Sequence, residues 1–287
     1  MKLWMRVLTA GALVVGVLIG LTLGVYRTSP RVPAGSRPLR TADGKPNLGG
    51  VWQVLNTANW DIQDHRAEPG PYPHLLGATF YQPPGKGVVE GNEIPYQSWA
   101  MEKKKENLAK RMAIDTEDLK VGDPEAKCYM PGVPRATYMP YPFQIVQGTD
   151  KILMAYEFAH ADRVIHLDKV DARPYLAVDT WMGHSEGRWE GDTLVVDVRG
   201  LIDQTWFDRA GNFHSDALHV VERYTPLGPD ALMYEATIED PRVFTRPWKM
   251  SMPVYRHLEK DAKIHEVQCV EFAEPFMYGS LSSPPLK

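Results

Sequence analysis

Apolar residues form one long uncharged run near the N-terminus and many short stretches after it. The long run extends from Val7 to Tyr26 and has basic residues on both sides. About twenty apolar residues are enough to span a bilayer as a helix. The run therefore predicts a transmembrane helix within residues 1–27.

The alternative for this run is a cleaved secretory signal peptide. Such a signal has a shorter apolar region and ends in small residues resembling Ala-x-Ala, whereas Val25-Tyr26-Arg27-Thr28 offers a poor cleavage site. We therefore expect an uncleaved, single-pass anchor. Basic residues on both flanks leave the orientation open, but the short N-terminal tail favours a cytoplasmic N-terminus. The domain is then expected on the periplasmic side of the cytoplasmic (inner) membrane.

Small residues recur every four positions within the predicted span, at Ala12, Gly16, Gly20 and Gly24. Such a stripe lies on one face of a helix and lets a second helix backbone approach closely. It predicts packing against a partner helix or a second copy of this chain. The alternative is that glycine is merely frequent in membrane spans.

After the anchor, residues 28–46 are rich in Pro, Gly, Ser and Arg and lack apolar periodicity, which predicts a flexible tether. Residues 47–287 are then expected to form a single exported domain. The 24 prolines, 23 glycines and 13 tyrosines of the chain favour short strands joined by turns over a helical bundle. A single helix is predicted, from Tyr96 to Ala113. Its apolar stripe is thin, so we expect it to lie on the surface of the domain.

Short apolar stretches separated by turn residues predict many strands in the second half of the chain. The predicted strands are Lys151–Phe158, Arg163–Leu167, a strand ending at Trp189, Thr193–Val198, Leu218–Tyr224, Leu232–Ile238, Trp248–Pro253 and Ile264–Glu271. Glu190-Gly191-Asp192 is a hairpin signal between two of them. Consecutive antiparallel strands predict a meander that closes as a lipocalin-like barrel, with a β-sandwich as the alternative.

Several motifs carry a family resemblance. The stretch GHSEGRWEGDTLVVDVRGLIDQTWFDRAGNFHSDALHVVERY, followed by EDPRVFTRPW and VQCVEF, resembles a large family of exported bacterial proteins described only as hypothetical. DPEAKCYMPGVPR, upstream, extends the resemblance to most of residues 49–272. The family resemblance implies that the protein is exported, but it implies no established activity. Gly50-x-Trp52 and GRWEGDTLVV also resemble parts of lipocalin-type and fatty-acid-binding barrels, which implies a barrel fold.

The charge and the cysteine content of the chain bear on its binding partners and on its redox compartment. The formal net charge is −4 and the charges are scattered, so we expect no nucleic-acid binding. The two cysteines, Cys128 and Cys269, form an even pair that predicts a disulfide in an oxidising compartment. The alternative is a pair of buried thiols in a reduced protein.

Candidate acid–base chemistry lies between residues 203 and 223. Asp208, His214 and Asp216 lie there beside aromatic residues, and His184 precedes the predicted hairpin. A histidine oriented by a carboxylate can move protons near neutral pH. These four residues are the predicted catalytic candidates, and the alternative is that each histidine stabilises a turn or strand end.

Two other motifs do not predict a site. His214-x-Asp216-x-x-His219 matches no zinc-ligand spacing and alternates between two faces if extended, so neither a metal nor another cofactor is predicted. Gly183-His184-Ser185-Glu186-Gly187 has the spacing of a hydrolase motif. The segment precedes a hairpin and not the helix that a nucleophile elbow needs.

The aromatic residues of the meander suggest a site for an apolar ligand. Trp181, Trp206, Phe207 and Trp248 are the predicted ligand-binding residues, with Arg223 as a candidate partner for a carboxylate. The alternative is that the aromatics fill the core and Arg223 pairs with a surface acid.

Two functions follow from these observations. The first is a membrane-anchored domain that binds an apolar or amphipathic small molecule or serves as an accessory subunit of a membrane assembly. The second is a cofactor-independent lyase, isomerase or hydratase that uses a histidine–carboxylate pair. They differ in whether His214 or His184 faces a cavity with a carboxylate in hydrogen-bond reach.

Overall fold

The computed structural model describes residues 38–69, 81–113, 118, 120–167, 178–271, 273 and 277. The chain divides into two compact units, Met1–Arg37 and Pro38–Lys287. The predicted anchor and its glycine stripe lie outside the described residues, so they stay predictions. Among the residues described, no helix is long and apolar enough to cross a membrane.

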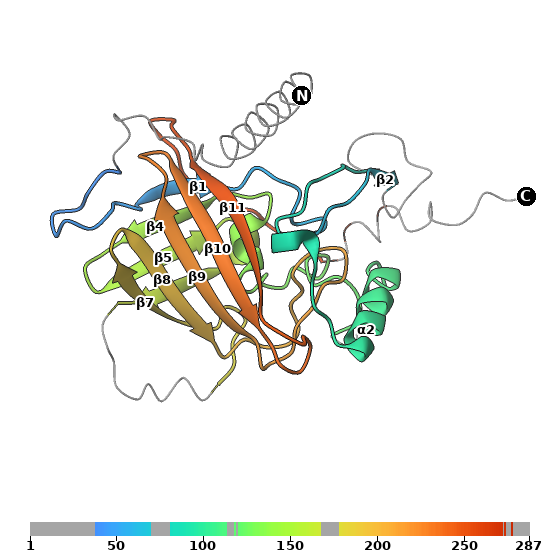
Figure 1. Ribbon diagram of the computed structural model, residues 1–287. Coiled ribbons are helices and arrows are strands. Elements are labelled where there is room, and N and C mark those ends of the chain that lie inside the picture. Colours follow the sequence, from blue (N-terminus) through green and yellow to red (C-terminus); the bar gives the residue numbers. More distant parts are fainter. Residues whose placement is uncertain are drawn as a thin grey trace, which may run out of the picture. The chain divides into compact units, whose positions relative to one another are not determined.

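Nine strands of the second unit close into a barrel, in the order β1-β11-β10-β9-β8-β7-β6-β5-β4 (Figure 1). The strands of the barrel are β1 (Gly50–Gln53), β4 (Phe143–Gln147), β5 (Lys151–Tyr156), β6 (Asp162–His166), β7 (His184–Glu190), β8 (Thr193–Arg199), β9 (His219–Pro226), β10 (Ala231–Glu239) and β11 (Trp248–Arg256). A separate two-stranded sheet pairs β2 (Glu68–Pro69) with β3 (Tyr81–Gln82). The predicted mainly β fold and its barrel are confirmed.

Alternating burial explains why these segments form the barrel. Every second residue of β10 is buried, beginning with Leu232, and β11 alternates in the same way. Successive side chains of a strand point to opposite faces, so this pattern places one apolar row inside. Four consecutive residues of β8, Thr193 to Val196, are buried, so its first half is covered on both faces.

The topology departs from the predicted meander in three places. Strand β6 pairs with β7 in parallel, and β1 lies between β11 and β4. Strand β4 was not predicted. Ile264–Glu271 was predicted as a strand, and this was wrong, because the segment has no regular structure. The barrel is already closed by the pairing of β1 with β11, which leaves no free edge for a further strand.

Helices are few in the described part of the chain. The predicted helix is present as α2 (Ser98–Ala109), shorter than expected at both ends, and a second short helix is α3 (Arg135–Tyr138). Two 3-10 turns are η2 (Glu90–Asn92) and η3 (Phe158–His160).

The C-terminal part of the predicted tether belongs to the compact unit. Thr41 and Lys45 close a turn through a backbone hydrogen bond of 2.9 Å. Beside this turn, Arg40 pairs with Asp192 at the β7–β8 hairpin, with 2.8 Å between Nη2 and Oδ2. Residues 38–46 of the predicted tether therefore cluster with the second compact unit.

A buried ion pair occupies the interior of the barrel. Arg163 of β6 donates to both carboxylate oxygens of Glu222 on β9, at 2.7 and 3.0 Å. The hydroxyls of Tyr224 and Tyr234 donate to the same carboxylate at 3.0 and 2.8 Å. Burial opposes the charge on Arg163, but Glu222 and the tyrosines outweigh it, and the pKa of Arg163 is raised. The interior is therefore a packed core with a polar centre.

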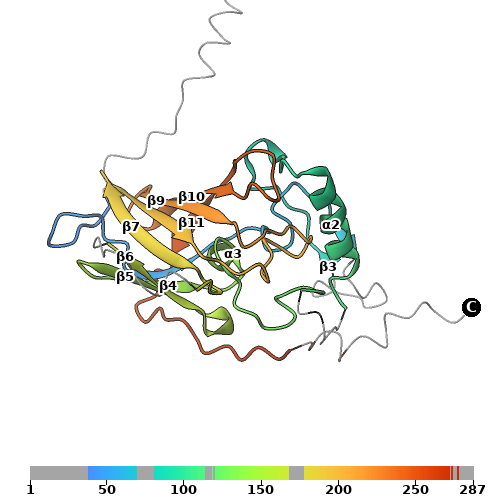
Figure 2. The same cartoon turned by 90° about the horizontal axis from the view of Figure 1, so that it is seen from below.

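Loops from several strands meet at one end of the barrel. Strands β1, β5 and β8 end there and β4 and β9 begin there, because these neighbours run antiparallel. Figures 1 and 2 show α2 beyond this end. Gly211, at φ +81°, brings the β8–β9 loop against α2, where a Cβ would lie 2.8 Å from the backbone nitrogen of Leu108. The end that carries these loops holds the candidate site.

Replacement of Glu222 by Gln tests the interior ion pair. The change leaves a buried guanidinium without its carboxylate, so the free energy of unfolding should fall by about 3–5 kcal/mol. Urea denaturation provides the measurement. Glu235→Gln, on β10 and only partly buried, is the control and should cost much less. Equal stability of the two variants would contradict a structural role for the pair.

Candidate functional site

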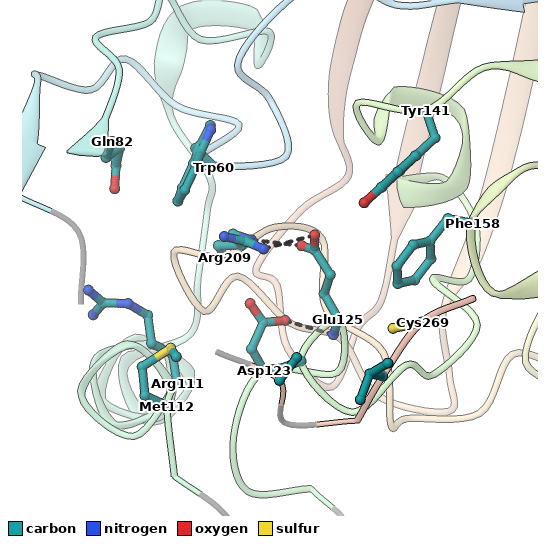
Figure 3. A pocket seen from close by; sticks show the side chains of 13 residues that line it. Trp60, Gln82, Arg111, Met112, Asp123, Glu125, Tyr141, Phe158, Arg209 and Cys269 are labelled. Carbon is teal, nitrogen blue, oxygen red and sulfur yellow. Dashed lines mark hydrogen bonds and ion pairs between the residues drawn. The ribbon is translucent and has the colours of Figure 1, made fainter. Parts of the chain in front are cut away.

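A cavity of about 230 Å³ lies among these loops (Figure 3). We call it the Trp60 pocket. Its walls come from the loop after β1, the segment after α2, the turn around Asp123, the β5–β6 and β8–β9 connections and the C-terminal segment. The lining residues are Trp60, Gln82, Arg111, Met112, Asp123, Glu125, Ala126, Tyr141, Phe158, Arg209, Cys269, Val270 and Ala273.

Glu125 is the hub of the charged wall. Its carboxylate accepts hydrogen bonds from Asn59 Nδ2 at 3.0 Å and from Arg135 Nη2 at 2.8 Å. Arg209 adds two more, from Nε at 2.8 Å and Nη2 at 3.0 Å. Burial would raise the pKa of Glu125, but Arg209 and Arg135 outweigh it and lower the pKa to about 2. Glu125 is therefore ionised at physiological pH.

Arg135 is buried behind the pocket wall and contacts Asn59, Asp123 and Glu125. It opens helix α3 and is 1 % exposed. Its Nε donates to Asn59 Oδ1 at 2.9 Å, while its Nη atoms face Glu125 and Asp123. A buried guanidinium needs such partners, because an unpaired charge in the interior is very costly. The pairing therefore fixes the Asn59 loop and the Asp123–Glu125 turn relative to α3.

Aromatic side chains form the other walls. Trp60 packs over the guanidinium of Arg209, with 4.6 Å from Cζ to the ring centroid, a cation–π contact. Tyr141 and Phe158 lie with their ring centroids 5.4 Å apart. Figure 3 shows these two rings on the opposite side of the cavity from Gln82 and Arg111. The pocket thus combines charged and aromatic surfaces.

Asp123 differs from Glu125 although both carboxyls line the pocket. Its Oδ1 accepts from the Glu125 backbone N–H at 2.9 Å and lies 3.4 Å from Arg135 Nη1. Burial raises the pKa of Asp123. Two neighbouring carboxyls whose environments move their pKa values in opposite directions can supply an acid and a base.

Arg111 is the second arginine that lines the pocket, beside Arg209. Its Nη1 donates to the Leu108 carbonyl oxygen at 3.1 Å. Among the described residues, no carboxylate lies within ion-pair distance of it. Burial lowers the pKa of Arg111, so the protein around it does not fully compensate its charge.

The predicted disulfide is confirmed. Cys128 and Cys269 are joined across 141 positions, with their Cα atoms 5.6 Å apart. Cys269 lines the pocket, and the C-terminal segment that it fixes also bonds to the β5–β6 connection, from His265 N to Glu157 Oε2 at 2.9 Å. The disulfide therefore holds one wall of the pocket in place.

The predicted catalytic residues lie elsewhere and have separate partners. His214 is buried, with Nε2 at 2.7 Å from Thr205 Oγ1 and Nδ1 at 2.9 Å from the Ser215 carbonyl oxygen. Because a carbonyl only accepts, Nδ1 carries the proton and Nε2 accepts from the threonine. Burial lowers the pKa of His214, which favours this neutral form. Both ring nitrogens are therefore occupied by structural hydrogen bonds.

The other three candidates are similarly engaged. Asp208 accepts from the backbone N–H groups of Ile62, Ala210 and Asn212 and from the Asn212 side chain. Burial nevertheless raises the pKa of Asp208 to about 7. Asp216 pairs with Arg242 at the surface, and His184 Nε2 lies 2.8 Å from the Val178 carbonyl oxygen. Among the described contacts, no hydrogen bond joins His214 to Asp208 or Asp216.

The predicted ligand-binding aromatics are also outside the Trp60 pocket. Phe207 and Trp248 pack edge to face in the core, 5.5 Å between centroids, and Trp206 is buried. Trp181 packs on Tyr129. Arg223 lies on the outer face of β9, where it pairs with Glu190 at 2.9 Å.

The pocket residues were missed because they come from loops without periodicity. Asp123, Glu125 and Arg135 occur together in DPEAKCYMPGVPR, and this concentration of charge among turn residues was the available signal. Nothing in the sequence points to Trp60 or Arg111. In the part of the chain that the structure describes, no group of His, Cys, Asp and Glu side chains is arranged to hold a metal ion.

Comparisons with models of protein families, with curated proteins and with solved structures find no match to this chain.

His214→Gln tests the structural role of this histidine. The lost hydrogen bonds should lower the free energy of unfolding by about 1–3 kcal/mol at pH 7.5. Because burial lowers the pKa of His214, the unfolded chain binds more protons than the folded one below about pH 6.5. The wild type should therefore lose stability as pH falls through this range, and the variant should lose less.

Urea unfolding at pH 5.5 and 7.5 measures both effects. His257→Gln, at a half-buried histidine bonded to Gln53, serves as the control for the loss of a histidine elsewhere. An unchanged stability of His214→Gln at both pH values would contradict the structural role.

Proposed function

We propose that this chain is a membrane-anchored, extracytoplasmic domain that binds a small amphipathic molecule in the Trp60 pocket. The observation that carries the proposal is the combination, in one cavity, of aromatic walls with a charged wall held rigid by buried ion pairs. Ligand sites are typically concave and mostly apolar, with a few well-placed polar groups. The barrel serves as the scaffold of this site.

The segments that resemble the exported bacterial family meet at this pocket. DPEAKC contributes Asp123 and Glu125, TWFDRAG contributes Arg209, and VQC contributes Cys269. This convergence supports the proposal that the chain belongs to that family and that the pocket is its working site. The disulfide is consistent with an oxidising compartment.

A lipocalin-like relationship is part of the proposal for the barrel. Gly50-x-Trp52 lies on β1, and the Arg256 guanidinium of β11 covers the Trp52 ring at 4.2 Å from its centroid. The interior is filled by the Arg163–Glu222 pair and its neighbours, so the relationship concerns the scaffold and not the position of the ligand. The glycine stripe of the proposed anchor would permit a helix partner.

A second candidate function, acid–base catalysis, is favoured by one observation. Asp123 and Glu125 line the same cavity, and their pKa values move apart, upward for Asp123 and to about 2 for Glu125. A cofactor-independent lyase, isomerase or hydratase would use Asp123 as the proton donor. The His214 version of this proposal has less support, because both of its ring nitrogens already have partners.

Membrane topology is tested with reporters fused after Lys287. A reporter active only outside the cytoplasm should be active, because the proposed anchor places the domain there. A reporter active only in the cytoplasm, fused at the same position, is the control and should be silent. The reverse pattern would contradict the proposed location.

Ligand binding is tested by native mass spectrometry of the full-length chain purified in mild detergent. The wild type should retain a small molecule that Trp60→Ala loses, because the tryptophan forms a wall of the pocket. Trp99→Ala, an exposed tryptophan of α2, is the matched control and should retain the molecule. Identical spectra for all three proteins would contradict a ligand site at Trp60.

A further inference from the structure

We infer that the ligand of the Trp60 pocket carries an anionic group and that Arg111 binds it. This inference rests on the proposed function and names the chemical class of the ligand. Three observations carry it: the charge balance at the pocket, the lack of an acidic partner for Arg111 among the described residues, and the partial burial of its side chain.

The charged groups that line the pocket, taken together with Arg135 beneath it, are positive on balance. Arg111, Arg209 and the underlying Arg135 contribute three positive charges, whereas Asp123 and Glu125 contribute at most two negative charges. The excess is at least one positive charge, on a chain whose formal net charge is −4. Like charges confined near a low-dielectric wall attract a counter-ion.

Arg111 holds this excess charge. Arg135 and Arg209 both pair with Glu125, at 2.8 Å in each case. Arg111 donates instead to a carbonyl at the end of α2. The acidic groups that influence it, Asp123 and Glu68, both lie beyond ion-pair distance within the described structure.

Arg111 is partly buried, so the lack of an acidic partner among the described residues matters for its guanidinium. Removing a guanidinium from water is costly unless a charge-assisted hydrogen bond replaces its hydration. Because guanidinium presents a planar fork of donors, it matches a carboxylate, a phosphonate or a phosphate. A ligand with such a group would supply the partner that the described residues do not provide.

The cavity also limits the size of the ligand. Its volume is about 230 Å³, which suits a small molecule or one end of a longer one. Trp60, Tyr141 and Phe158 offer ring faces for an aromatic or short aliphatic body. The inferred class is therefore a small organic acid whose anionic group faces Arg111.

The inference is tested with matched probes on the full-length chain in lipid nanodiscs. Phenylacetate and phenylacetamide have the same shape but differ in charge, and benzylphosphonate presents a tetrahedral anion on a similar body. Ligand-observed NMR titrations give the Kd of each, with empty nanodiscs as the blank. Arg111→Gln is the test variant, and Arg246→Gln, at an exposed position, is the control.

We expect at least one of the two anions to bind about ten-fold more tightly than phenylacetamide, in line with a charge-assisted hydrogen bond. Arg111→Gln should abolish this preference, and Arg246→Gln should keep it. Equal affinities for the anions and the amide, or a preference that survives in Arg111→Gln, would overturn the inference.

The outcomes separate this inference from the proposed function. Binding of phenylacetamide that equals that of the anions and is lost in Trp60→Ala would sustain a ligand site and reject its anionic specificity. Absence of binding by all three probes would overturn the inference, while the mass of a retained molecule decides the proposed function on its own.

Discussion

The buried carboxylate of Glu125 is the interaction on which the site depends. A charge removed from water must be paired, and here Arg135, Arg209 and Asn59 supply the partners from three separate segments. Loops normally lie at the surface because their backbone groups need water. This cluster instead draws the loops together, so that the cavity beside it has fixed walls.

The interior of the barrel also holds a buried carboxylate that is paired with an arginine. Arg163 pairs with Glu222, and the hydroxyls of two tyrosines donate further hydrogen bonds to the same carboxylate. Such a pair contributes little net stability, because desolvation offsets the attraction, but removing one partner is strongly destabilising. The filled interior leaves little room for a ligand there. Concave surface arises instead where loops of unequal length meet at one end.

The sequence was informative where periodicity governs the structure. The alternation of β10 and β11 predicted their strands, and the even cysteine count predicted the bond between Cys128 and Cys269. Ile264–Glu271 has similar alternation but no edge to pair with, which is a property of the closed barrel and not of the segment. The contacts of Glu125 link positions up to 84 apart through loops. No local pattern encodes such a meeting.

Asp208, singled out from the sequence for its chemistry, acts one layer behind the pocket. It accepts the Ile62 N–H at 2.9 Å, and the neighbouring Arg209 N–H donates to the Asn59 carbonyl oxygen at 2.9 Å. These two bonds fasten the Trp60 loop to the β8–β9 loop on either side of Trp60. The many polar residues of the β8–β9 loop therefore serve to satisfy buried backbone groups. The aromatic wall and the charged wall keep their spacing because this layer holds them.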